Sequence, residues 1–328
     1  MKKLSAKITG TGSYLPEKVL TNFDLEKMVE TSDEWIQTRT GIRERRVARE
    51  DQASSDLALE ASRRALDDAR VGVDELDLIM VATITPDQLF PSTACELQTK
   101  LGAPRAAAFD LLCACSGFTY ATVVAAQFIK NGAARKVLIV GSECLTKITD
   151  YTDRTSCILF GDGAGAAVME AAEGDCGLLH FELGADGSGG ECMILPGGGS
   201  RIPTTAATLE QRLQYMKIRG REVYRFAVTK MSELVANAVK AAGISLDDVK
   251  LIIPHQVNLR ILEAAAKRLG IDSAKFYVNI DRYGNTSAAS IPIALDEARR
   301  EKRFSDSDIL IFVAFGGGLT WGSVVWKW

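Results

Sequence analysis

The chain has 328 residues, of which 47% are hydrophobic and 25% are charged, a composition typical of a globular protein with room for two domains or one large duplicated domain. Its formal net charge of −3 argues against general nucleic-acid binding and against a basic membrane-surface protein. Two lysines follow Met1 without the apolar stretch of a signal peptide, and no run approaches the roughly 18 consecutive apolar residues of a membrane span, so we expect a cytoplasmic protein with neither nucleic acid nor membrane as a partner.

The predicted elements occur twice in the same order along the chain. A helix end with a loop and a buried strand comes first in each half, and a helix ending in Leu-Gly and two further apolar strands follow. The matched segments are 65–81 and 238–254, 100–102 and 268–270, 136–140 and 308–313, and 165–168 and 322–325. Because four matches share one order, we interpret the chain as an internal duplication.

The alternation of short apolar strands with amphipathic helices predicts an α/β protein in which helices lie between and outside mixed sheets. We expect two similar halves, residues 1–174 and 175–328, packed as one pseudo-symmetric body, because no Pro-rich or Ser-rich linker separates them. Residues 187–208 are rich in Gly, Pro and Thr, and we expect this longest irregular segment to be a surface excursion or a lid.

A cysteine at the start of a predicted helix is the strongest chemical signal. We expect the helix over 117–130, with a C-terminal cap at 131–132, and a strand before it that contains Cys113. Cys115 then lies at a strand-to-helix elbow, where the helix dipole and free N–H groups lower the pKa of the thiol and yield a nucleophile. The alternative role, a small buried hydrophobe, is the one that we expect for Cys113.

The other cysteines indicate neither disulfides nor a metal. Seven cysteines scattered through the chain favour reduced thiols over a disulfide framework. Cys113 and Cys115 form a C-x-C pair without a second Cys/His pair at zinc-site spacing, so we expect no metal site.

Only two histidines are available as partners for the thiol. His255 follows Pro254 at the carboxyl end of a predicted buried strand, in the kind of loop where open α/β sheets bind ligands. His180 lies in an alternating strand and is expected to be structural. A lone histidine is usually structural, so position alone leaves a structural role open for His255 too.

Asn285 lies in the turn 283–290, before a helix that begins near Pro292. In the repeat this turn corresponds to the elbow of Cys115, so the pseudo-twofold predicts that Asn285 approaches Cys115. An amide beside a neutral imidazole supplies two hydrogen-bond donors for an enolate oxygen. The alternative is a turn asparagine with a positive φ.

Two glycine clusters, 161–165 and 316–318, match neither the phosphate-binding loop nor the Rossmann pattern. Because glycine has no Cβ, the amides of Gly316 to Gly318 can approach a thioester oxygen closely.

Six motifs together resemble those of β-ketoacyl-[acyl-carrier-protein] synthase III, the initiating condensing enzymes of type II fatty-acid synthesis in the thiolase superfamily. The motifs are 31–45, 114–118, 160–165, 254–260, 284–287 and 315–322. The similarity extends from Ile8 to Trp326. It implies a thiolase-like fold in which two βαβαβαββ halves form five layers, α-β-α-β-α, with the cysteine in the first half and the histidine and asparagine in the second.

The resemblance implies a catalytic triad of Cys115, His255 and Asn285. An acyl group, for which acetyl-CoA is the expected donor, moves to Cys115, and malonyl-ACP then loses CO2 and attacks the acyl-cysteine in a ping-pong mechanism. The amides of Cys115 and Gly317 hold the oxyanion. The CoA thioester is a substrate, no cofactor is expected, and the resemblance implies a homodimer.

The resemblance also assigns the binding residues. CoA binding falls to Thr31, Trp35, Arg39, Arg154, Ile218, Gly220 and Asn258. The acyl pocket falls to Phe90, Cys113, Leu145, Leu159 and Phe160, with Phe90 reaching across the dimer. Docking of the acyl carrier protein (ACP) falls to Gln256 and Arg260, with a basic cluster of Lys217, Arg219, Arg221 and Lys267 that is otherwise a solvated face.

Two positions depart from the family pattern. Cys113 replaces the usual alanine, and Leu112 is bulkier than expected, so the preference for acetyl-CoA stays open. The alternative is a family member of a secondary pathway that uses a longer or branched acyl-CoA or a different malonyl carrier. A non-catalytic partner subunit would lack the nucleophile that this chain retains.

Overall fold

The computed structural model describes residues 4–328, whose strands form two mixed sheets and two short hairpin-like pairs. The first sheet has the order β1-β7-β6-β4-β5, and its strands are β1 (Leu4–Tyr14), β4 (Leu78–Ala82), β5 (Ala107–Leu111), β6 (Lys136–Glu143) and β7 (Gly163–Glu173). The second has the order β11-β12-β13-β8, and its strands are β8 (Gly177–Ala185), β11 (Val249–Pro254), β12 (Ile309–Gly316) and β13 (Thr320–Lys327).

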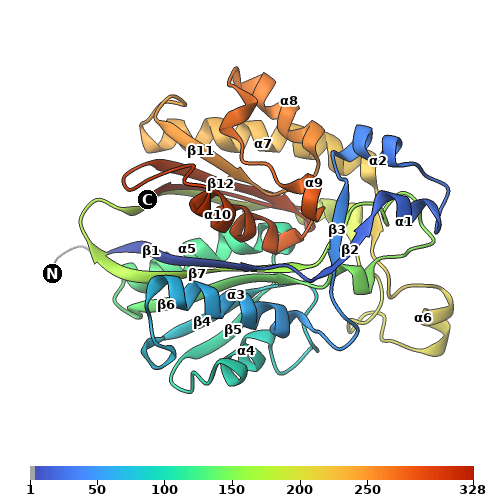
Figure 1. Ribbon diagram of the computed structural model, residues 1–328, viewed down its shortest axis with the longest axis horizontal. Coiled ribbons are helices and arrows are strands. Elements are labelled where there is room, and N and C mark those ends of the chain that lie inside the picture. The colour runs from blue at the N-terminus through green and yellow to red at the C-terminus, as the bar shows by residue number, and fades with distance from the viewer. Residues whose placement is uncertain (1–3) are drawn as a thin grey trace.

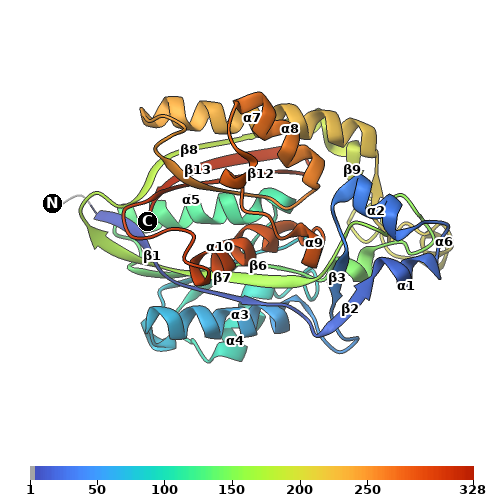
Figure 2. The same cartoon turned by 45° about the horizontal axis from the view of Figure 1, so that its top comes forward.

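Helices cover both outer faces and fill the space between the sheets (Figure 1). Outside the first sheet lie α3 (Ser54–Ala69) and α4 (Thr93–Leu101); α5 (Gly117–Lys130) and α10 (Ser290–Arg300) lie between the sheets; α7 (Gly220–Ala242) and α8 (Leu259–Leu269) lie outside the second sheet. Figure 2 shows the same five layers from a turned view. The predicted α-β-α-β-α order is confirmed.

The two halves follow one topology. The first half runs β1-α3-β4-α4-β5-α5-β6-β7. In the second half β8, α7, β11 and α8 are followed by a single parallel bridge between Ile252 and Phe276 in place of a third strand, and then by α10, β12 and β13. The boundary between residues 174 and 175 stays a proposal, supported by the change of sheet between β7 and β8.

The remaining elements gather at one end of the sheets, on the right of Figure 1. They are β2 (Lys18–Thr21), α1 (Asn22–Glu26), α2 (Asp33–Thr40), β3 (Glu44–Val47), β9 (Met193–Ile194), α6 (Ala206–Glu210), β10 (Lys217–Ile218) and α9 (Ile280–Tyr283). The 3₁₀ turns of the chain are η1 (Val73–Glu75), η2 (Ala114–Ser116), η3 (Leu145–Ile148), η4 (Gly187–Cys192), η5 (Ser273–Lys275) and η6 (Ser287–Ala289). The predicted irregular segment 187–208 contains only η4, β9 and the start of α6.

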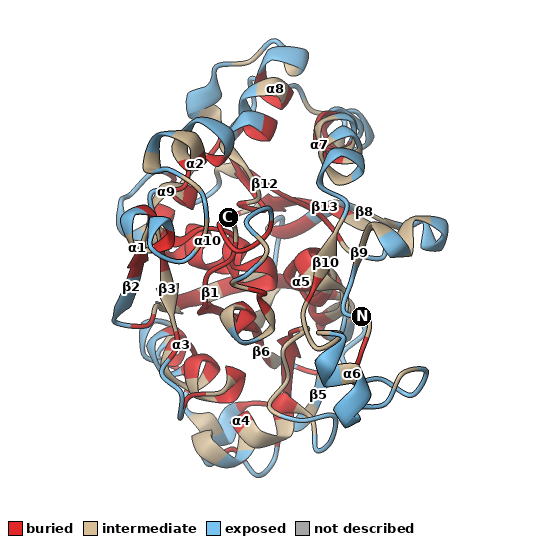
Figure 3. Cartoon of the chain, turned by 90° about the vertical axis from the view of Figure 1, so that its right-hand side faces the viewer, coloured by how far each residue is buried: buried red, intermediate tan, exposed pale blue. Residues whose placement is uncertain are grey.

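The two central helices are buried because they meet a sheet on each side. In α5 the sequence GFTYATVVAAQFIK is mostly small or apolar and buried, as expected for a helix without a solvent face. Figure 3 shows buried residues gathered on α5, α10 and the sheets, whereas α6 is exposed. In the part of the chain that the structure describes, no helix is long and apolar enough to cross a bilayer.

Glycines in the first sheet let the start of α10 lie directly on it. A Cβ at Gly141 in β6 would stand 2.3 Å from the carbonyl oxygen of Ala288, and one at Gly165 in β7 would stand 2.6 Å from the nitrogen of Ile293. Both contacts are shorter than any side chain tolerates. The turn that carries Asn285 therefore approaches the sheet because these two strand positions lack side chains.

Candidate active site

Cys115 lies in η2, between the end of β5 and the start of α5, as predicted. The predicted helix over 117–130 is confirmed, but the prediction that Cys113 lies within the strand is wrong, because β5 ends at Leu111. The carbonyl of Cys113 instead accepts hydrogen bonds from the Ser116 N–H (3.1 Å) and the Thr320 hydroxyl (3.2 Å). These bonds hold the turn and take Cys113 out of the sheet ladder.

The glycine turn after β12 packs on this cysteine. A Cβ at Gly316 would lie 2.8 Å from the backbone nitrogen of Cys115 and 3.0 Å from its Cβ. Gly317 faces Met193 and Ala114. The cluster at 161–165 is used differently, since Gly161 and Gly165 accommodate the backbone at Tyr283 and Pro292.

The thiol of Cys115 is not acidic in this structure, which corrects the predicted lowering of its pKa. Cys115 is 5% exposed, and burial raises the pKa of its thiol to about 12. The negative charge of Glu143 raises this pKa further, while Ser287 and the cysteine's own backbone offset part of the effect of burial. Desolvation of the charged sulfur is the largest of these effects.

His255 lies directly after β11, with its backbone N–H bonded to the carbonyl of Val313 (2.8 Å). Its ring meets the edge of the Phe315 ring at a centroid distance of 6.0 Å, and Nδ1 lies 2.7 Å from Oγ of Ser290. Burial lowers the pKa of His255 to about 3, so the imidazole is neutral at physiological pH. His180 lies in β8, as predicted.

Asn285 is held by its own backbone and by Ser287. Its N–H donates to the carbonyl of Leu159 (2.8 Å), and its carbonyl accepts from Gly161 N–H (3.0 Å). The backbone N–H of Ser287 donates to Oδ1 of Asn285 (2.8 Å), which identifies the oxygen end of the amide and leaves the NH2 to donate elsewhere. The alternative of a positive φ at Asn285 is wrong, since Gly284 and Ser287 carry the positive φ in this turn.

The two turns predicted to correspond do meet. The turns η2 and η6 are in contact, and a Cβ at Gly117 would lie 3.4 Å from the Cβ of Ala288. The site therefore forms where the starts of α5 and α10 approach each other, with His255 tied to α10 through Ser290.

An apolar cavity of about 380 Å³ adjoins the turn of Cys115. Its lining includes Leu112, Ala114 and Gly317 together with Ile84, Ile148, Met193, Ile194, Leu195 and Met216. Of the predicted pocket residues, Leu145, Leu159 and Phe160 belong to one hydrophobic cluster with Met216, and Cys113 is half-buried between two lining residues in the sequence. Phe90 is 85% exposed and does not line this cavity within one chain.

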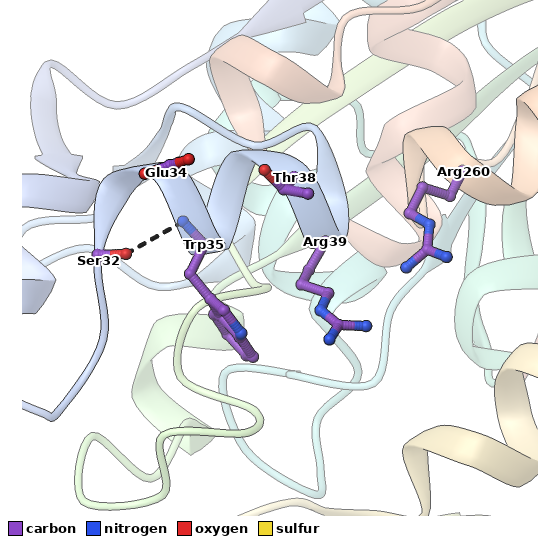
Figure 4. Close-up of a pocket in the computed structure, with 6 residues that line it drawn as sticks. All are labelled: Ser32, Glu34, Trp35, Thr38, Arg39 and Arg260. Carbon is purple, nitrogen blue, oxygen red and sulfur yellow. Dashed lines mark hydrogen bonds between the residues drawn. The ribbon is translucent and has the colours of Figure 1, made fainter.

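A second cavity of about 630 Å³ opens at the molecular surface between α2 and α8. Figure 4 shows Trp35 and Arg39 extending to the same side of α2, with Arg260 of α8 facing the same space. The guanidinium carbons of Arg39 and Arg154 lie 6.0 and 5.9 Å from the centre of the Trp35 ring. An aromatic face with two cations beside it is suited to a nucleotide base.

The other predicted CoA residues do not line this cavity, and they differ in how available their side chains are. Asn258 caps α8, and both ends of its side-chain amide are hydrogen-bonded. The NH2 donates to the carbonyl of Arg39 (2.9 Å), and the oxygen accepts from Arg260 N–H (2.9 Å). The Thr31 hydroxyl is buried and has no hydrogen-bond partner within residues 4–328. Ile218 belongs to β10, and Gly220 is the first residue of α7.

The two predicted docking residues differ sharply. Arg260 is exposed, whereas Gln256 is 1% exposed and donates to the carbonyls of Pro254 and Tyr277 (both 3.0 Å). Gln256 therefore braces the loop around His255 and presents nothing to a docking protein, which corrects that prediction. In the basic cluster, Lys217 pairs with Asp150 and Arg219 pairs with Glu191.

Glu143, the last residue of β6, is a further buried group near the site that no sequence motif indicated. Its buried carboxyl accepts hydrogen bonds from the hydroxyls of Thr85 (2.6 Å) and Thr83 (3.2 Å) and from the N–H of Ile84 (3.2 Å). Burial nevertheless raises the pKa of Glu143 to about 7. Its position at the end of a strand was the one sequence feature that could have indicated a functional role. Ser290, which contacts His255, had no such feature in the sequence.

Replacing Glu143→Gln should change how stability depends on pH. Folding raises the pKa of Glu143 above the ordinary pKa of a glutamate. The stability that its protonated carboxyl contributes is therefore fully present below that ordinary pKa and is lost as pH rises through about 7. We expect the variant to gain roughly 1–3 kcal/mol relative to the parent chain between pH 5 and pH 8. Denaturant unfolding at both pH values measures this, with exposed Glu210→Gln as the control. A difference in unfolding free energy that stays constant with pH would contradict the assignment.

Comparisons with known proteins agree with this geometry. Residues 109–187 match the family model "3-Oxoacyl-[acyl-carrier-protein (ACP)] synthase III", and residues 239–328 match the model of its C-terminal region. The beta-ketoacyl-[acyl-carrier-protein] synthase III of Caldanaerobacter subterraneus subsp. tengcongensis is 55% identical, over 100% of this chain and 99% of its own length. The beta-ketoacyl-[acyl-carrier-protein] synthase III of Desulfitobacterium hafniense is 53% identical, over 99% of this chain and 98% of its own length.

A solved structure gives the same result. The crystal structure of 3-oxoacyl-[acyl-carrier-protein] synthase III from Aquifex aeolicus superposes with a TM-score of 0.91 at 46% identity, covering 98% of this chain and 100% of that one. The fold, both family models and the full-length identity agree, and the chain belongs to the 3-oxoacyl-[acyl-carrier-protein] synthase III family.

Proposed function

We propose that the chain condenses a short acyl-CoA with malonyl-ACP, giving 3-oxoacyl-ACP, CO2 and CoA, and so initiates fatty-acid synthesis. The observation that carries the proposal is the meeting of η2 and η6, which groups a buried thiol, a neutral imidazole and an asparagine amide beside a glycine turn. An acyltransferase needs those groups, namely a nucleophile and donors for two successive oxyanions.

In the first half-reaction Cys115 attacks the acyl-CoA thioester. A carbon–sulfur bond forms to Cys115 and the bond to CoA breaks, and the thiol proton leaves with CoA. The backbone amides of Cys115 and Gly317 are proposed to hold the tetrahedral oxyanion. The contact of Gly316 with Cys115 supports this pairing, because it brings the glycine turn against the nucleophile.

In the second half-reaction malonyl-ACP loses CO2, and the electron pair of the broken carbon–carbon bond becomes an enolate. We assign its stabilisation to Nε2 of His255 and the NH2 of Asn285, which donate to the thioester oxygen. The carbanion attacks the acyl-cysteine, the bond from the acyl carbon to Cys115 breaks, and the released sulfur takes a proton from solvent water. Decarboxylation supplies the electrons for the new bond, so the reaction needs no cofactor.

The acyl group is proposed to enter the apolar cavity beside Cys115. Its volume of about 380 Å³ and its lining by Leu112, Met193 and Met216 suit a short aliphatic chain. Acetyl-CoA is the primer that we propose. Leu145, Leu159, Phe160 and Cys113 would shape the far wall.

CoA and ACP are proposed to approach through the outer cavity. Trp35 would stack on the adenine, with Arg154 on its other face and Arg39 at the rim, alongside Thr31, Ile218 and Gly220. Arg154 must then swing aside, because it now lies 5.9 Å from the ring centre. Exposed Arg260 of α8 would meet an acidic ACP at the same mouth.

A homodimer is proposed through β5, one of the two edge strands of the first sheet. Phe109 of β5 is 36% exposed, and Leu112, Leu89 and Phe90 near it are 76%, 82% and 85% exposed. An unpaired edge flanked by large apolar side chains is a ready site for a second copy of the chain. Phe90 would then close the partner's pocket.

We also propose a cytoplasmic location for the protein. The seven cysteines are free, which supports this proposal.

The variant Cys115→Ser should abolish transfer of labelled acetyl groups from acetyl-CoA to the protein, because the hydroxyl is a far weaker nucleophile at neutral pH. Intact-protein mass spectrometry measures the adduct, and half-buried Cys176→Ser serves as the control that keeps one acetyl group per chain. Full labelling of Cys115→Ser would overturn the proposed nucleophile.

The variant Trp35→Ala should raise KM for acetyl-CoA by roughly 10-fold or more, because stacking of a base on an aromatic ring contributes about 1–3 kcal/mol. A truncated acetyl thioester without the nucleotide should react equally well with both proteins. Exposed Phe23→Ala on α1 is the matched control. An equal loss for both donors would place Trp35 outside the nucleotide site.

A further inference from the structure

His255 presents two ring nitrogens in very different surroundings. Nδ1 lies 2.7 Å from Oγ of Ser290, whereas Nε2 is buried and has no hydrogen-bond partner in the described part of the chain. His255 is 1% exposed and Ser290 2%. A neutral imidazole carries one N–H and one lone pair, so the partner of Nδ1 decides which of these Nε2 offers.

The hydroxyl of Ser290 has one proton and two acceptors within reach. They are Nδ1 of His255 at 2.7 Å and the carbonyl oxygen of Ser287 at 2.8 Å. Donation to the carbonyl forces the imidazole proton onto Nδ1 and leaves a bare lone pair at Nε2. Donation to Nδ1 places the proton on Nε2.

The carbonyl of Ser287 does not depend on that hydroxyl. It already accepts the backbone N–H of Ser290, at the junction of η6 and α10. The hydroxyl is therefore free to donate to Nδ1 without leaving a buried carbonyl unsatisfied. A backbone carbonyl in the place of Oγ would have fixed the opposite tautomer.

We propose that Ser290 is a positioning residue that donates its hydroxyl to Nδ1 of His255 and thereby holds the proton on Nε2. The inference rests on the proposed function, because an enolate oxygen requires a donor at Nε2. Ser290 is the first residue of α10, so the helix that follows Asn285 also sets the tautomer of His255. Both enolate donors then depend on one turn.

The first test is nitrogen NMR of the full-length chain labelled with ¹⁵N-histidine at neutral pH. The chain has only two histidines, so the spectrum of the variant His180→Gln contains only the ring-nitrogen signals of His255. We expect Nε2 of His255 to carry the proton and Nδ1 to give the signal of an unprotonated ring nitrogen. A proton on Nδ1 overturns the proposal, and this measurement needs no variant at Ser290.

The second test separates the half-reactions in Ser290→Ala. Removing the hydroxyl leaves Nδ1 without a partner, so we expect malonyl-ACP decarboxylation to fall roughly 10- to 100-fold. Acetylation of Cys115 by acetyl-CoA should stay within about threefold, since it does not use Nε2. Ser232→Ala is the matched control, because the hydroxyl of this buried helix serine donates to backbone carbonyls of α7, those of Val228 and Thr229.

The outcomes distinguish this proposal from the one on which it rests. Decarboxylation by Ser290→Ala that equals the rate of Ser232→Ala overturns the role of Ser290. A parent chain that is never acetylated by acetyl-CoA overturns the proposed function instead, whatever tautomer the spectrum shows.

Discussion

The site depends on how closely the starts of α5 and α10 approach each other between the two sheets. Small residues make this approach possible, since a Cβ at Gly117 would lie only 3.4 Å from the Cβ of Ala288. They also let both helix starts lie directly on the first sheet, because a Cβ at Gly141 of β6 would stand 2.3 Å from the carbonyl oxygen of Ala288 and one at Gly117 would stand 2.9 Å from the Cβ of Ala82 at the end of β4. From the opposite side, the glycine turn at Gly316 reaches Cys115. Duplication of one βαβαβαββ unit explains why two equivalent turns are available to meet. The buried starts of α5 and α10 thus form part of the core and also bring the turns of Cys115 and Asn285 together.

Burial also determines the protonation state of each ionisable group in the site. It raises the pKa of Cys115 to about 12, lowers that of His255 to about 3 and raises that of Glu143 to about 7. The free thiol is therefore neutral, and in the proposed reaction its proton leaves with CoA. The neutral imidazole is a donor whose direction depends on its neighbour, and a charged imidazolium is excluded by desolvation. A dry site strengthens hydrogen bonds to an enolate for the same reason.

Much of this was predictable from the sequence. Periodicity and the repeated order predicted the layers and the helix after Cys115, and the motifs predicted the family. The acidity of Cys115 was predicted wrongly, because a helix-start pattern reveals the dipole but not the depth of burial. Cys113 was placed in the strand because a turn closed by its own carbonyl leaves no pattern. Gln256 was assigned to ACP docking because sequence does not reveal that its NH2 donates to the carbonyls of Pro254 and Tyr277 while its oxygen accepts from Asn279 N–H. Ser290 and Glu143 carry no motif, and only tertiary contacts disclose them.

We propose that His255 stabilises the enolate and does not activate the thiol of Cys115. The most direct measurement compares His255→Ala in the two half-reactions, with labelled acetyl-CoA for acetylation of Cys115 and labelled malonyl-ACP for release of CO2. We expect decarboxylation to fall by about 100-fold or more while acetylation stays within a few-fold of the parent rate. An equal loss of both half-reactions would contradict it, because His255 would then be needed to activate the thiol.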